Sequence, residues 1–372
     1  MTSAEKKLTE FIYKNKISVK TAASIMLENF YENTCKSAMR CMSAECISIL
    51  NASEDEIVYV INKNAIDTLF VGKNNIRIAN NLLWECKSMK QYVCIDTDDL
   101  MLENEQNSKL MNRKLWNYIA NNATDDIEGG AWINSYTRQH FTKEEMKEYA
   151  DNVIMKVLPF LNGQKKILEI GCSSGLTMYS LAPLSNEYVA IDISNRIIEK
   201  NKIRILNQNI NNIKLFCLYA HEVEKIAESN FDIIIMNSVA QCFQGHFYFM
   251  RVFELLIKKM NDNGIIFIGD IMDADKKIDF LQSLIEYRIA HNANTKIDFS
   301  NELFFSKDFF NHLYIDYPEI KEIKISSKYY SIENELTKFR FDALIELNKN
   351  ARYKHTGNKK KFYYSCNLSA YN

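Results

Sequence analysis

The sequence predicts an α/β protein whose main part is a doubly wound, largely parallel sheet. From residue 165 onward, short apolar runs alternate with amphipathic helical stretches, which is typical of strands joined by helical crossovers on both faces. A glycine-rich turn at 171–175 follows the first of these runs. Two late apolar runs, 320–330 and 339–347, have no helical crossover between them, so they predict an antiparallel hairpin at the sheet edge.

The alternation fixes the expected elements of the main domain. The expected strands are 166–170, 188–192, 214–218, 231–237 and 265–269. The expected helices are 176–181, 195–206, 247–260 and 275–288. Residues from about 108 to 160 are also expected to be helical, ending in a helix at 143–158 that Pro159 stops. One face of this region is expected to carry Leu115, Trp116, Tyr118 and Ile119.

The first 100 or so residues are expected to form a small α+β unit. A helical pattern there contains Leu8, Phe11, Ile12, Ile25, Met26, Phe30 and Tyr31. It is followed by expected strands at 57–61, 68–71 and 92–95, with a helix at 78–86. This unit is either an accessory module that docks a partner or covers a substrate mouth, or a structural extension of the main domain.

The resulting division has three parts: an accessory region at 1–105, a main domain at 106–352 with its core at 165–347, and a tail at 353–372. An acid- and asparagine-rich segment at 96–107 is the expected linker. The basic cluster at 359–361 is expected to be part of a solvated tail.

The glycine-rich turn and the end of the next strand indicate a nucleoside site. The turn has the form Glu169-x-Gly171-x-x-x-Gly175, and the following strand ends at Asp192, about 20 residues later, where an acid can hold a ribose diol. The turn lacks the glycine spacing of a dinucleotide site and carries an acid before it. This favours S-adenosylmethionine, a cationic nucleoside with an amino-acid tail, over NAD. An ordinary strand–turn–helix of another doubly wound protein is the alternative.

Ligands of such sheets bind beyond the carboxyl ends of the strands, so the residues there form the expected site. Gly175 is expected to let the backbone pass close to the ligand, and a helix from Leu176 to direct its amides at a carboxylate. Strand ends also carry Asn, Ser and Asp as turn formers. Asp270 can therefore be either a site residue or a turn former. The expected cofactor-binding residues are Glu169, Gly171, Cys172, Ser173, Gly175, Asp192, Ile193, Ala220, His221, Glu222, Asn237 and Ser238.

Six ordered blocks resemble the methyltransferase domains embedded in nonribosomal peptide synthetases and their stand-alone relatives, from about residue 130 to 347. The blocks are AWINSYT (131–137) with EEMKEY (144–149), LEIGCSSG (168–175), AHE (220–222), NSVAQCF (237–243), IFIGD (266–270) and NELTKFRFD (334–342). The resemblance implies a seven-stranded, Rossmann-like class I sheet. Ser173 and Ser174 stand where the family mostly has Gly and Thr, and Cys242 replaces an aromatic residue. These departures concern substrate identity.

The resemblance implies methyl transfer from S-adenosylmethionine without a metal, to a small molecule or a carrier-bound aminoacyl or peptidyl intermediate. A synthetase or carrier protein is the implied partner. The substrate-side catalytic candidates are Tyr136, Asn237, Gln241 and Glu335, with no base assigned. The imidazoles of His221, His246 and His312 are further candidate bases by residue type. The alternative from another class is a methyltransferase-like scaffold protein of an assembly line that has lost turnover.

Composition argues against several other classes. The formal net charge of the 372 residues is −1, without the basic patch of a nucleic-acid-binding protein. No apolar run approaches the length of a membrane span, and the polar N-terminus lacks the apolar segment of a signal peptide, so the expected location is the cytoplasm. The nine cysteines form no Cys-x-x-Cys pair, which predicts reduced thiols and no metal site.

Overall fold

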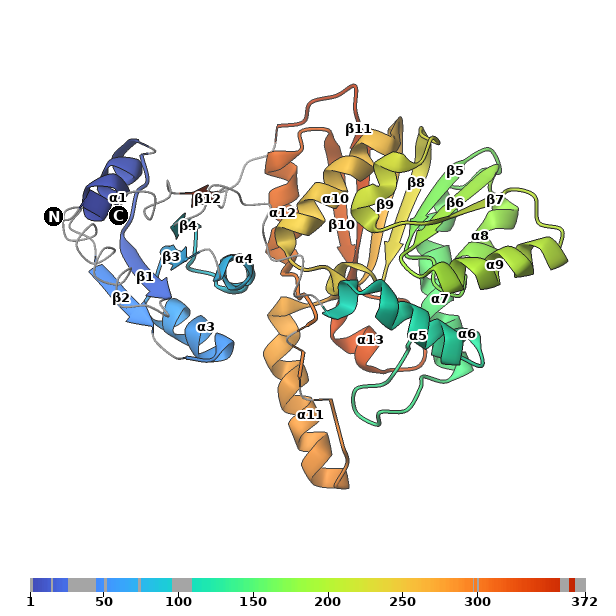
Figure 1. Ribbon diagram of the computed structural model, residues 1–372, viewed down its shortest axis with the longest axis horizontal. Helices are drawn as coiled ribbons and strands as arrows, with labels where there is room; N and C mark the ends of the chain where they lie inside the picture. Colours follow the sequence, from blue (N-terminus) through green and yellow to red (C-terminus); the bar gives the residue numbers. More distant parts are fainter. Residues whose placement is uncertain are drawn as a thin grey trace. The chain divides into compact units, whose positions relative to one another are not determined.

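The computed structural model describes residues 3–14, 16–25, 45–49, 52–72, 75–95, 109–296, 298–299, 301–354 and 361–364. The chain divides into two compact units (Figure 1). The first comprises residues 1–107, 244–247 and 356–372, and the second comprises 108–243 and 248–355. None of the helices in the described ranges has the length and apolar character needed to cross a bilayer.

The second unit is built on a seven-stranded sheet with the order β10-β11-β9-β8-β5-β6-β7. Strands β5 to β9 pair in parallel, and β11 pairs antiparallel with both β9 and β10. The predicted doubly wound sheet with an antiparallel terminal pair is therefore confirmed. The strands are β5 (Lys166–Ile170), β6 (Glu187–Asp192), β7 (Ile213–Cys217), β8 (Phe231–Asn237), β9 (Met260–Met272), β10 (Ile320–Ser326) and β11 (Arg340–Asn348).

Helices cover both faces of this sheet. Several begin at a side chain that caps the helix, as Thr142 does for α7 through a capping box with Glu145. A one-turn helix, α13, lies between the two antiparallel strands, where the sequence predicted no helical crossover. The helices are α5 (Arg113–Asn122), α6 (Asp126–Gly129), α7 (Lys143–Val157), α8 (Met178–Leu181), α9 (Asn195–Asn207), α10 (His246–Lys259), α11 (Lys277–His291), α12 (Lys307–Asp316) and α13 (Glu335–Lys338).

Two apolar layers hold the helices on the sheet. On one face, α7, α8 and α9 contribute Val153, Met178 and Ile198 to a buried cluster with strand residues such as Ile167 and Phe267. Another cluster, formed by α10, α12 and the segment before α12, is aromatic: the rings of Phe249, Phe253, Phe305, Phe309 and Phe310 have centroid separations of 5.1–6.1 Å. These layers leave the carboxyl ends of the parallel strands available for a site.

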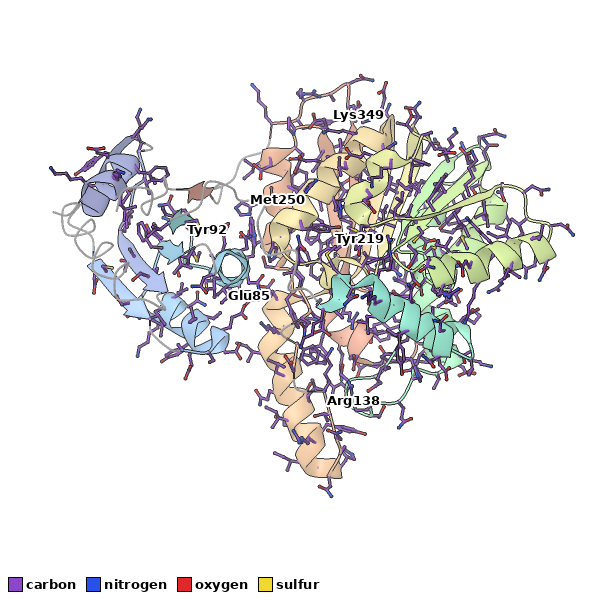
Figure 2. The ribbon with its side chains drawn as sticks, in the orientation of Figure 1. Glu85, Tyr92, Arg138, Tyr219, Met250 and Lys349 are labelled. Atoms are coloured by element: carbon purple, nitrogen blue, oxygen red, sulfur yellow. The ribbon has the colours of Figure 1, made fainter. Side chains whose placement is uncertain are left out.

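The first unit is a second parallel sheet, with the order β12-β4-β3-β1-β2. Every strand pair in it is parallel, so this unit belongs to the α/β class and the predicted α+β class is wrong for it. Tyr92 is buried in β4 and donates a hydrogen bond of 2.7 Å to Asn80 (Figure 2). The elements are α1 (Ser3–Lys14), β1 (Thr21–Ile25), β2 (Glu45–Ile49), α3 (Glu54–Lys63), β3 (Thr68–Gly72), α4 (Ile76–Glu85), β4 (Gln91–Ile95) and β12 (Lys361–Tyr364).

Further sequence predictions for this unit need correction. The β-branched run at 57–61 is helical, because the Ser53–Glu56 capping box starts α3 just before it. Ile25 ends a strand and is not part of a helix, while Met26, Phe30, Tyr31 and the linker at 96–107 lie outside the described residues. Lys361 begins β12, which pairs with β4, so this part of the expected tail is a sheet strand.

Candidate active site

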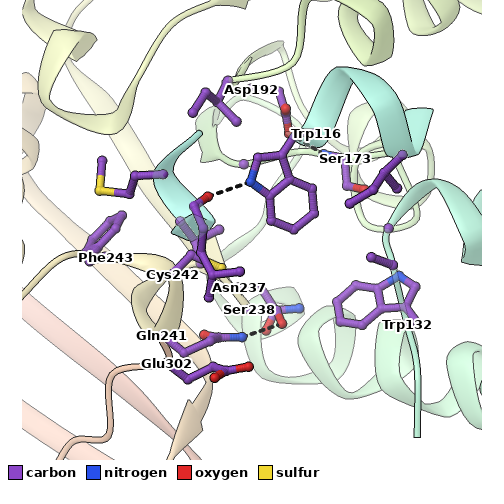
Figure 3. A pocket seen from close by; sticks show the side chains of 18 of the residues that line it. Trp116, Trp132, Ser173, Asp192, Asn237, Ser238, Gln241, Cys242, Phe243 and Glu302 are labelled. Atoms are coloured by element: carbon purple, nitrogen blue, oxygen red, sulfur yellow. Dashed lines mark hydrogen bonds between the residues drawn. The ribbon is translucent and has the colours of Figure 1, made fainter. Parts of the chain in front are cut away.

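A cavity of about 310 Å³ lies at the carboxyl ends of the parallel strands of the second unit (Figure 3). It is bordered by the loops after β5, β6, β7 and β8, by α5, by the segment 129–135, and by Lys296, Phe299 and Glu302. Strand β5 lies between β6 and β8, so the cavity sits where the strand order reverses, as expected for a ligand site of a doubly wound sheet.

The structure brings most of the predicted site residues to this cavity, but not all of them. The predicted residues that line it are Gly171, Ser173, Asp192, Ile193, Ala220, Asn237, Ser238, Gln241 and Glu335. Those that do not line it are Glu169, Cys172, Gly175, His221, Glu222 and Tyr136.

Asp192 is fixed at one end of the cavity by backbone donors. The N–H groups of Ser173 and Ser194 donate hydrogen bonds of 3.0 and 2.8 Å to its two carboxylate oxygens. Its side chain is buried, and this burial raises the pKa of the carboxyl, while the two backbone hydrogen bonds oppose the rise. Each oxygen has a further lone pair, so the carboxylate can also accept from the hydroxyls of a ligand.

Gly171 brings the backbone of the turn against the cavity. Its φ of +74° lies in the left-handed region, and its N–H donates to the carbonyl of Ile191 at 2.8 Å. A Cβ at this position would lie 2.5 Å from the side chain of Val239. The turn therefore needs glycine here for both its conformation and its space.

The second glycine of the turn has a different role from the one predicted. A Cβ on Gly175 would meet Tyr179 and Met178, and Gly175 does not line the cavity, so this glycine serves the turn itself. The thiol of Cys172 is buried, which raises its pKa, and it too lies outside the cavity lining. Helix α8 begins at Met178, two residues later than predicted, and has one turn, so the direction of its amides toward a ligand stays a prediction.

Glu169 lies in the core and not at the cavity. Side chains alternate along a strand, so Glu169 shares the sheet face of Ile167, which is part of the buried cluster beneath α7 to α9. There the hydroxyl of Tyr188 donates to its carboxyl at 3.0 Å. Burial raises the pKa of Glu169 to about 8. The prediction that Glu169 contacts the cofactor therefore has no support in the geometry.

The histidines proposed as bases also lie outside the cavity lining. The ring of His221 stacks on Tyr219 at 5.5 Å, and its Nδ1 lies 2.8 Å from the hydroxyl of Tyr248. Tyr219 and Tyr248 line the cavity, so His221 contacts two residues of the lining without being part of it. His246 and His312 are buried in helices α10 and α12 and do not line the cavity.

Glu222 and Tyr136 have structural partners. Glu222 accepts from the N–H of Tyr219 at 3.0 Å and pairs with Lys225 at 2.5 Å, which lowers the pKa of Glu222. The hydroxyl of Tyr136 lies 2.6 Å from that of Ser283 on α11, and partial burial raises the pKa of Tyr136. Neither side chain reaches the cavity in the structure.

A chain of hydrogen bonds connects three residues across the loop after β8. Ser238, at φ +58°, contacts Asp270 Oδ2 at 2.8 Å, and Gln241 Nε2 contacts Ser238 Oγ at 2.7 Å (Figure 3). Because a carboxylate only accepts, the serine hydroxyl donates to Asp270 and the amide of Gln241 donates to the serine. Asn237 also donates, to the hydroxyl of Tyr149 at 2.7 Å. The loop is therefore held in one arrangement.

Asp270 belongs to a buried charge cluster that connects β9 with α7 and β11. Arg340 and Lys328 pair with Asp270 at 2.5 and 3.2 Å, and Lys328 and Lys156 pair with Asp342 at 3.0 and 2.6 Å. Burial by itself would raise the pKa of Asp342, but the two lysines hold it well below its usual range. Arg340 lines the cavity, and the sequence did not identify it as a site residue.

Glu335 lies at the start of α13 and is hydrogen-bonded to Ser135, in the segment 131–137. The N–H and the hydroxyl of Ser135 donate to its two oxygens at 2.7 and 2.8 Å. Only 3% of its surface is exposed, and burial raises the pKa of its carboxyl, with Arg340 acting against the rise. An ion pair between Lys296 and Glu302 lies in the same cavity wall.

Much of the cavity wall is aromatic, and the sequence did not assign these residues to a site. Trp116 is held by a hydrogen bond of 2.6 Å from Nε1 to the carbonyl of Leu110. The predicted apolar face of α5 includes Trp116 and could have indicated its place at the site, although Tyr118 of that face is 68% exposed. The aromatic lining residues are Trp116, Trp132, Phe141, Tyr219, Phe243, Tyr248 and Phe299.

Across the described part of the chain, no group of three or more His, Cys, Asp or Glu side chains is arranged to hold a metal ion.

Residues 161–336, which contain β5 to β10 and the loops around the cavity, match a family model described as a methyltransferase domain. This match agrees with the methyltransferase domain that the six sequence blocks predicted. The predicted co-substrate, S-adenosylmethionine, is consistent with this match.

The methyltransferase domain is similar to segments of large synthetases. Over 240 residues the chain is 27% identical to the probable non-canonical nonribosomal peptide synthetase CymA of Salinispora arenicola, covering 62% of this chain and 3% of CymA. It is 28% identical to chondramide synthase of Chondromyces crocatus, covering 58% of this chain and 6% of that protein. It is also 28% identical to enniatin synthase of Fusarium equiseti, covering 60% of this chain and 7% of that protein. The chain thus spans less than a tenth of the length of these relatives, and the predicted relation to nonribosomal peptide synthetases is confirmed.

Among solved structures, the N-methyltransferase NodS of Bradyrhizobium japonicum WM9 in complex with S-adenosylhomocysteine matches with a TM-score of 0.44. It is 14% identical, and the match covers 63% of this chain and 97% of NodS.

Proposed function

We propose that this chain is a cytoplasmic, S-adenosylmethionine-dependent methyltransferase that methylates a small molecule or a carrier-bound aminoacyl or peptidyl intermediate. The observation that carries the proposal is a single cavity with Asp192 on one side and Gln241 and Glu302 on the other (Figure 3). The first side suits a nucleoside, and the second offers polar groups to a methyl acceptor.

The residues at the nucleoside side fit S-adenosylmethionine. Asp192 keeps lone pairs for two ribose hydroxyls, and Gly171 has no side chain to fill the space beside the turn. Ala220 and Tyr219, from the loop after β7, border the same cavity. When bound, S-adenosylmethionine would supply an electrophilic methyl group on a sulfonium.

The other walls exclude water and orient the ligands. The faces of Trp116 and Trp132 border the cavity and attract a cationic group through the negative charge density of their rings. The hydrogen-bonded loop of Asn237, Ser238 and Gln241 keeps the acceptor side rigid. Alignment and desolvation are the main contributions that a protein makes to methyl transfer from an activated donor, and no metal step is part of the proposal.

The acceptor class follows from the relatives. The matched proteins are named as nonribosomal peptide synthetases and related synthases, which supports an aminoacyl or peptidyl acceptor presented by a carrier protein. We infer that a synthetase or carrier protein is the partner of this chain.

The test is to incubate the full chain with methyl-labelled S-adenosylmethionine and a panel of aminoacyl thioesters, both as N-acetylcysteamine thioesters and on carrier proteins. We expect label in at least one thioester, detected by mass spectrometry, together with release of S-adenosylhomocysteine. The same reaction with Asp192→Ala is the control and should transfer little label. Tight binding of S-adenosylmethionine without transfer to any acceptor would contradict the proposal and support the scaffold hypothesis.

A further inference from the structure

We propose that Glu335 is the proton acceptor of the methyl-transfer reaction and that Arg340, which Asp270 holds in the same cavity wall, is its positioning residue. The inference rests on the proposed function and adds a catalytic role and an acceptor class to it. The acceptor would be an amine, amide or hydroxyl group that carries a hydrogen to lose, and not a fully substituted nitrogen.

The geometry fixes the carboxylate of Glu335 at the cavity wall. Ser135 donates one hydrogen bond from its N–H and one from its hydroxyl, so both oxygens are held and the carboxylate cannot rotate. Each oxygen retains lone-pair capacity for another donor. Glu335 lines the cavity although only 3% of its surface is exposed, which places a base in a nearly dry environment.

Arg340 supplies positive charge beside this base. Its Nη1 is anchored on Asp270 at 2.5 Å, and Lys328 contacts the other oxygen of Asp270 at 3.2 Å, so the guanidinium is held from behind by the buried charge cluster. The side chain of Arg340 is 15% exposed and lines the same cavity as Glu335.

Three titratable or charged groups face Glu335 from the surrounding elements: Arg340 on β11, Lys296 from the segment after α11, and Tyr136 from the segment before α7. Burial raises the pKa of Glu335, and Arg340 opposes this most strongly, followed by the Ser135 hydrogen bonds and Lys296. A raised pKa makes the carboxylate of Glu335 a stronger base than a solvated carboxylate.

The reaction balances with Glu335 in this role. Glu335 accepts the proton that the acceptor loses, while the lone pair of the acceptor forms the bond to the methyl carbon. The electron pair of the broken carbon–sulfur bond stays on sulfur, which becomes a neutral thioether. Glu335 then returns to its carboxylate by losing the proton to water when the products leave.

The test uses two ligands that need no methyl acceptor. Sinefungin resembles S-adenosylmethionine but has a protonated amine where the transferable methyl group would be, whereas S-adenosylhomocysteine has nothing there. Calorimetric titration of the full chain with each ligand gives the affinity ratio from pH 5 to 8. We expect the wild type to prefer sinefungin, with a preference that grows as Glu335 ionises. In Glu335→Gln the preference should fall about tenfold or more and lose its pH dependence, because the charged acceptor is gone.

Three further variants separate a charge effect from a structural one. Glu199→Gln removes an exposed carboxylate of α9 that does not line the cavity and should keep the preference for sinefungin. Arg340→Gln should move the midpoint of the preference to higher pH, because the charge that lowers the pKa of Glu335 is lost, and Arg340→Lys should restore the midpoint in part.

The outcomes distinguish the two proposals. If neither ligand binds the wild type, the proposed function fails and this inference fails with it. If S-adenosylhomocysteine binds but Glu335→Gln keeps the full preference for sinefungin, only the role of Glu335 is overturned. An unchanged pH midpoint in folded Arg340→Gln would overturn the role of Arg340. If Arg340→Gln does not fold, the midpoint of Arg340→Lys decides whether the charge sets it.

Discussion

Ser173 and Asp192 are joined by a hydrogen bond of 3.0 Å, from the backbone N–H of the serine to the carboxylate of the aspartate. The bond connects the glycine-rich turn after β5 to the end of β6. A second N–H, from Ser194, holds the other oxygen. The acid is thereby fixed before any ligand binds, so little ordering is needed to present it to a nucleoside.

Asp192→Ala should weaken the binding of S-adenosylhomocysteine by about 2 kcal/mol or more, because a charged acceptor of two hydroxyls is lost. Isothermal titration calorimetry of the full chain measures this. Glu199→Ala, on the exposed side of α9, is the control and should bind like the wild type. Affinity within threefold of the wild type in Asp192→Ala would show that the ribose is held elsewhere.

Gly171→Ala should reduce both stability and ligand affinity. The left-handed φ of +74° costs an alanine about 1–2 kcal/mol, and its Cβ would meet Val239 at 2.5 Å beside the cavity. Gly163→Ala is a matched control, because Gly163 has a φ of +79° but nothing within 4 Å of a Cβ. Thermal unfolding and calorimetry should show similar backbone strain in both variants and weaker binding in Gly171→Ala alone. Equal ligand affinities in the two variants would contradict the close approach of the Gly171 backbone to the ligand.

Glu169→Gln should stabilise the domain at high pH and leave ligand affinity within threefold of the wild type. The pKa of Glu169 is about 8 in the folded state and about 4.3 unfolded, so its contribution is fully present below pH 4 and is lost as pH rises toward 8. Urea unfolding at pH 5 and pH 8.5 should show that only the wild type loses this contribution. A large loss of affinity in Glu169→Gln would restore the role that the sequence predicted for it.

Asp342→Asn should destabilise the domain by about 3–5 kcal/mol at pH 7, because Lys156 and Lys328 would lose a buried partner. The pKa of Asp342 is lowered in the folded state, so its contribution is present above the unfolded value of about 3.9 and is lost as pH falls through the lower folded value. Denaturant unfolding at several pH values measures the difference. Asp151→Asn, which breaks an exposed pair on α7, should cost far less than Asp342→Asn. Equal costs for the two variants would mean that the buried cluster adds no stability.

A chain that ends at Lys354 lacks β12 and should have a less stable first unit. Strand β4 is buried along its length, and removing β12 uncovers the N–H and C=O groups of its edge. Differential scanning calorimetry should show a lower transition for this unit and more aggregation, with ligand binding by the second unit retained. An unchanged unfolding profile would mean that β12 adds little to the sheet.

The sequence predicted the second unit well because each of its strands carries a local signal. The runs at 166–170 and 231–237 are rich in isoleucine, and they match β5 and β8 residue for residue. The run at 57–61 has a similar composition but follows the Ser53–Glu56 capping box, and the local helix signal outweighed β-propensity. Pairing of 361–364 with β4 joins segments far apart in the chain and has no local signal.

In the site, too, residues with a local sequence signal were predicted and residues placed by distant contacts were not. Asp192 and Gly171 lie at strand ends, where the topology itself brings residues together, and both line the cavity. Glu169 lies within β5, before the end of the strand, and its side chain faces the core. The motif alone does not reveal this orientation. Arg340 pairs with Asp270 at the cavity across 70 residues, and the contact of Ser135 with Glu335 spans 200 residues, so neither has a local signal in the sequence.

A crystal structure of the full chain with S-adenosylhomocysteine tests the central claim most directly. The account predicts the nucleoside in the cavity at the carboxyl ends of β5 and β6, with both ribose hydroxyls donating to Asp192 and the sulfur directed toward Glu335. A ligand bound elsewhere, or a cavity that stays empty at saturating ligand, would contradict it.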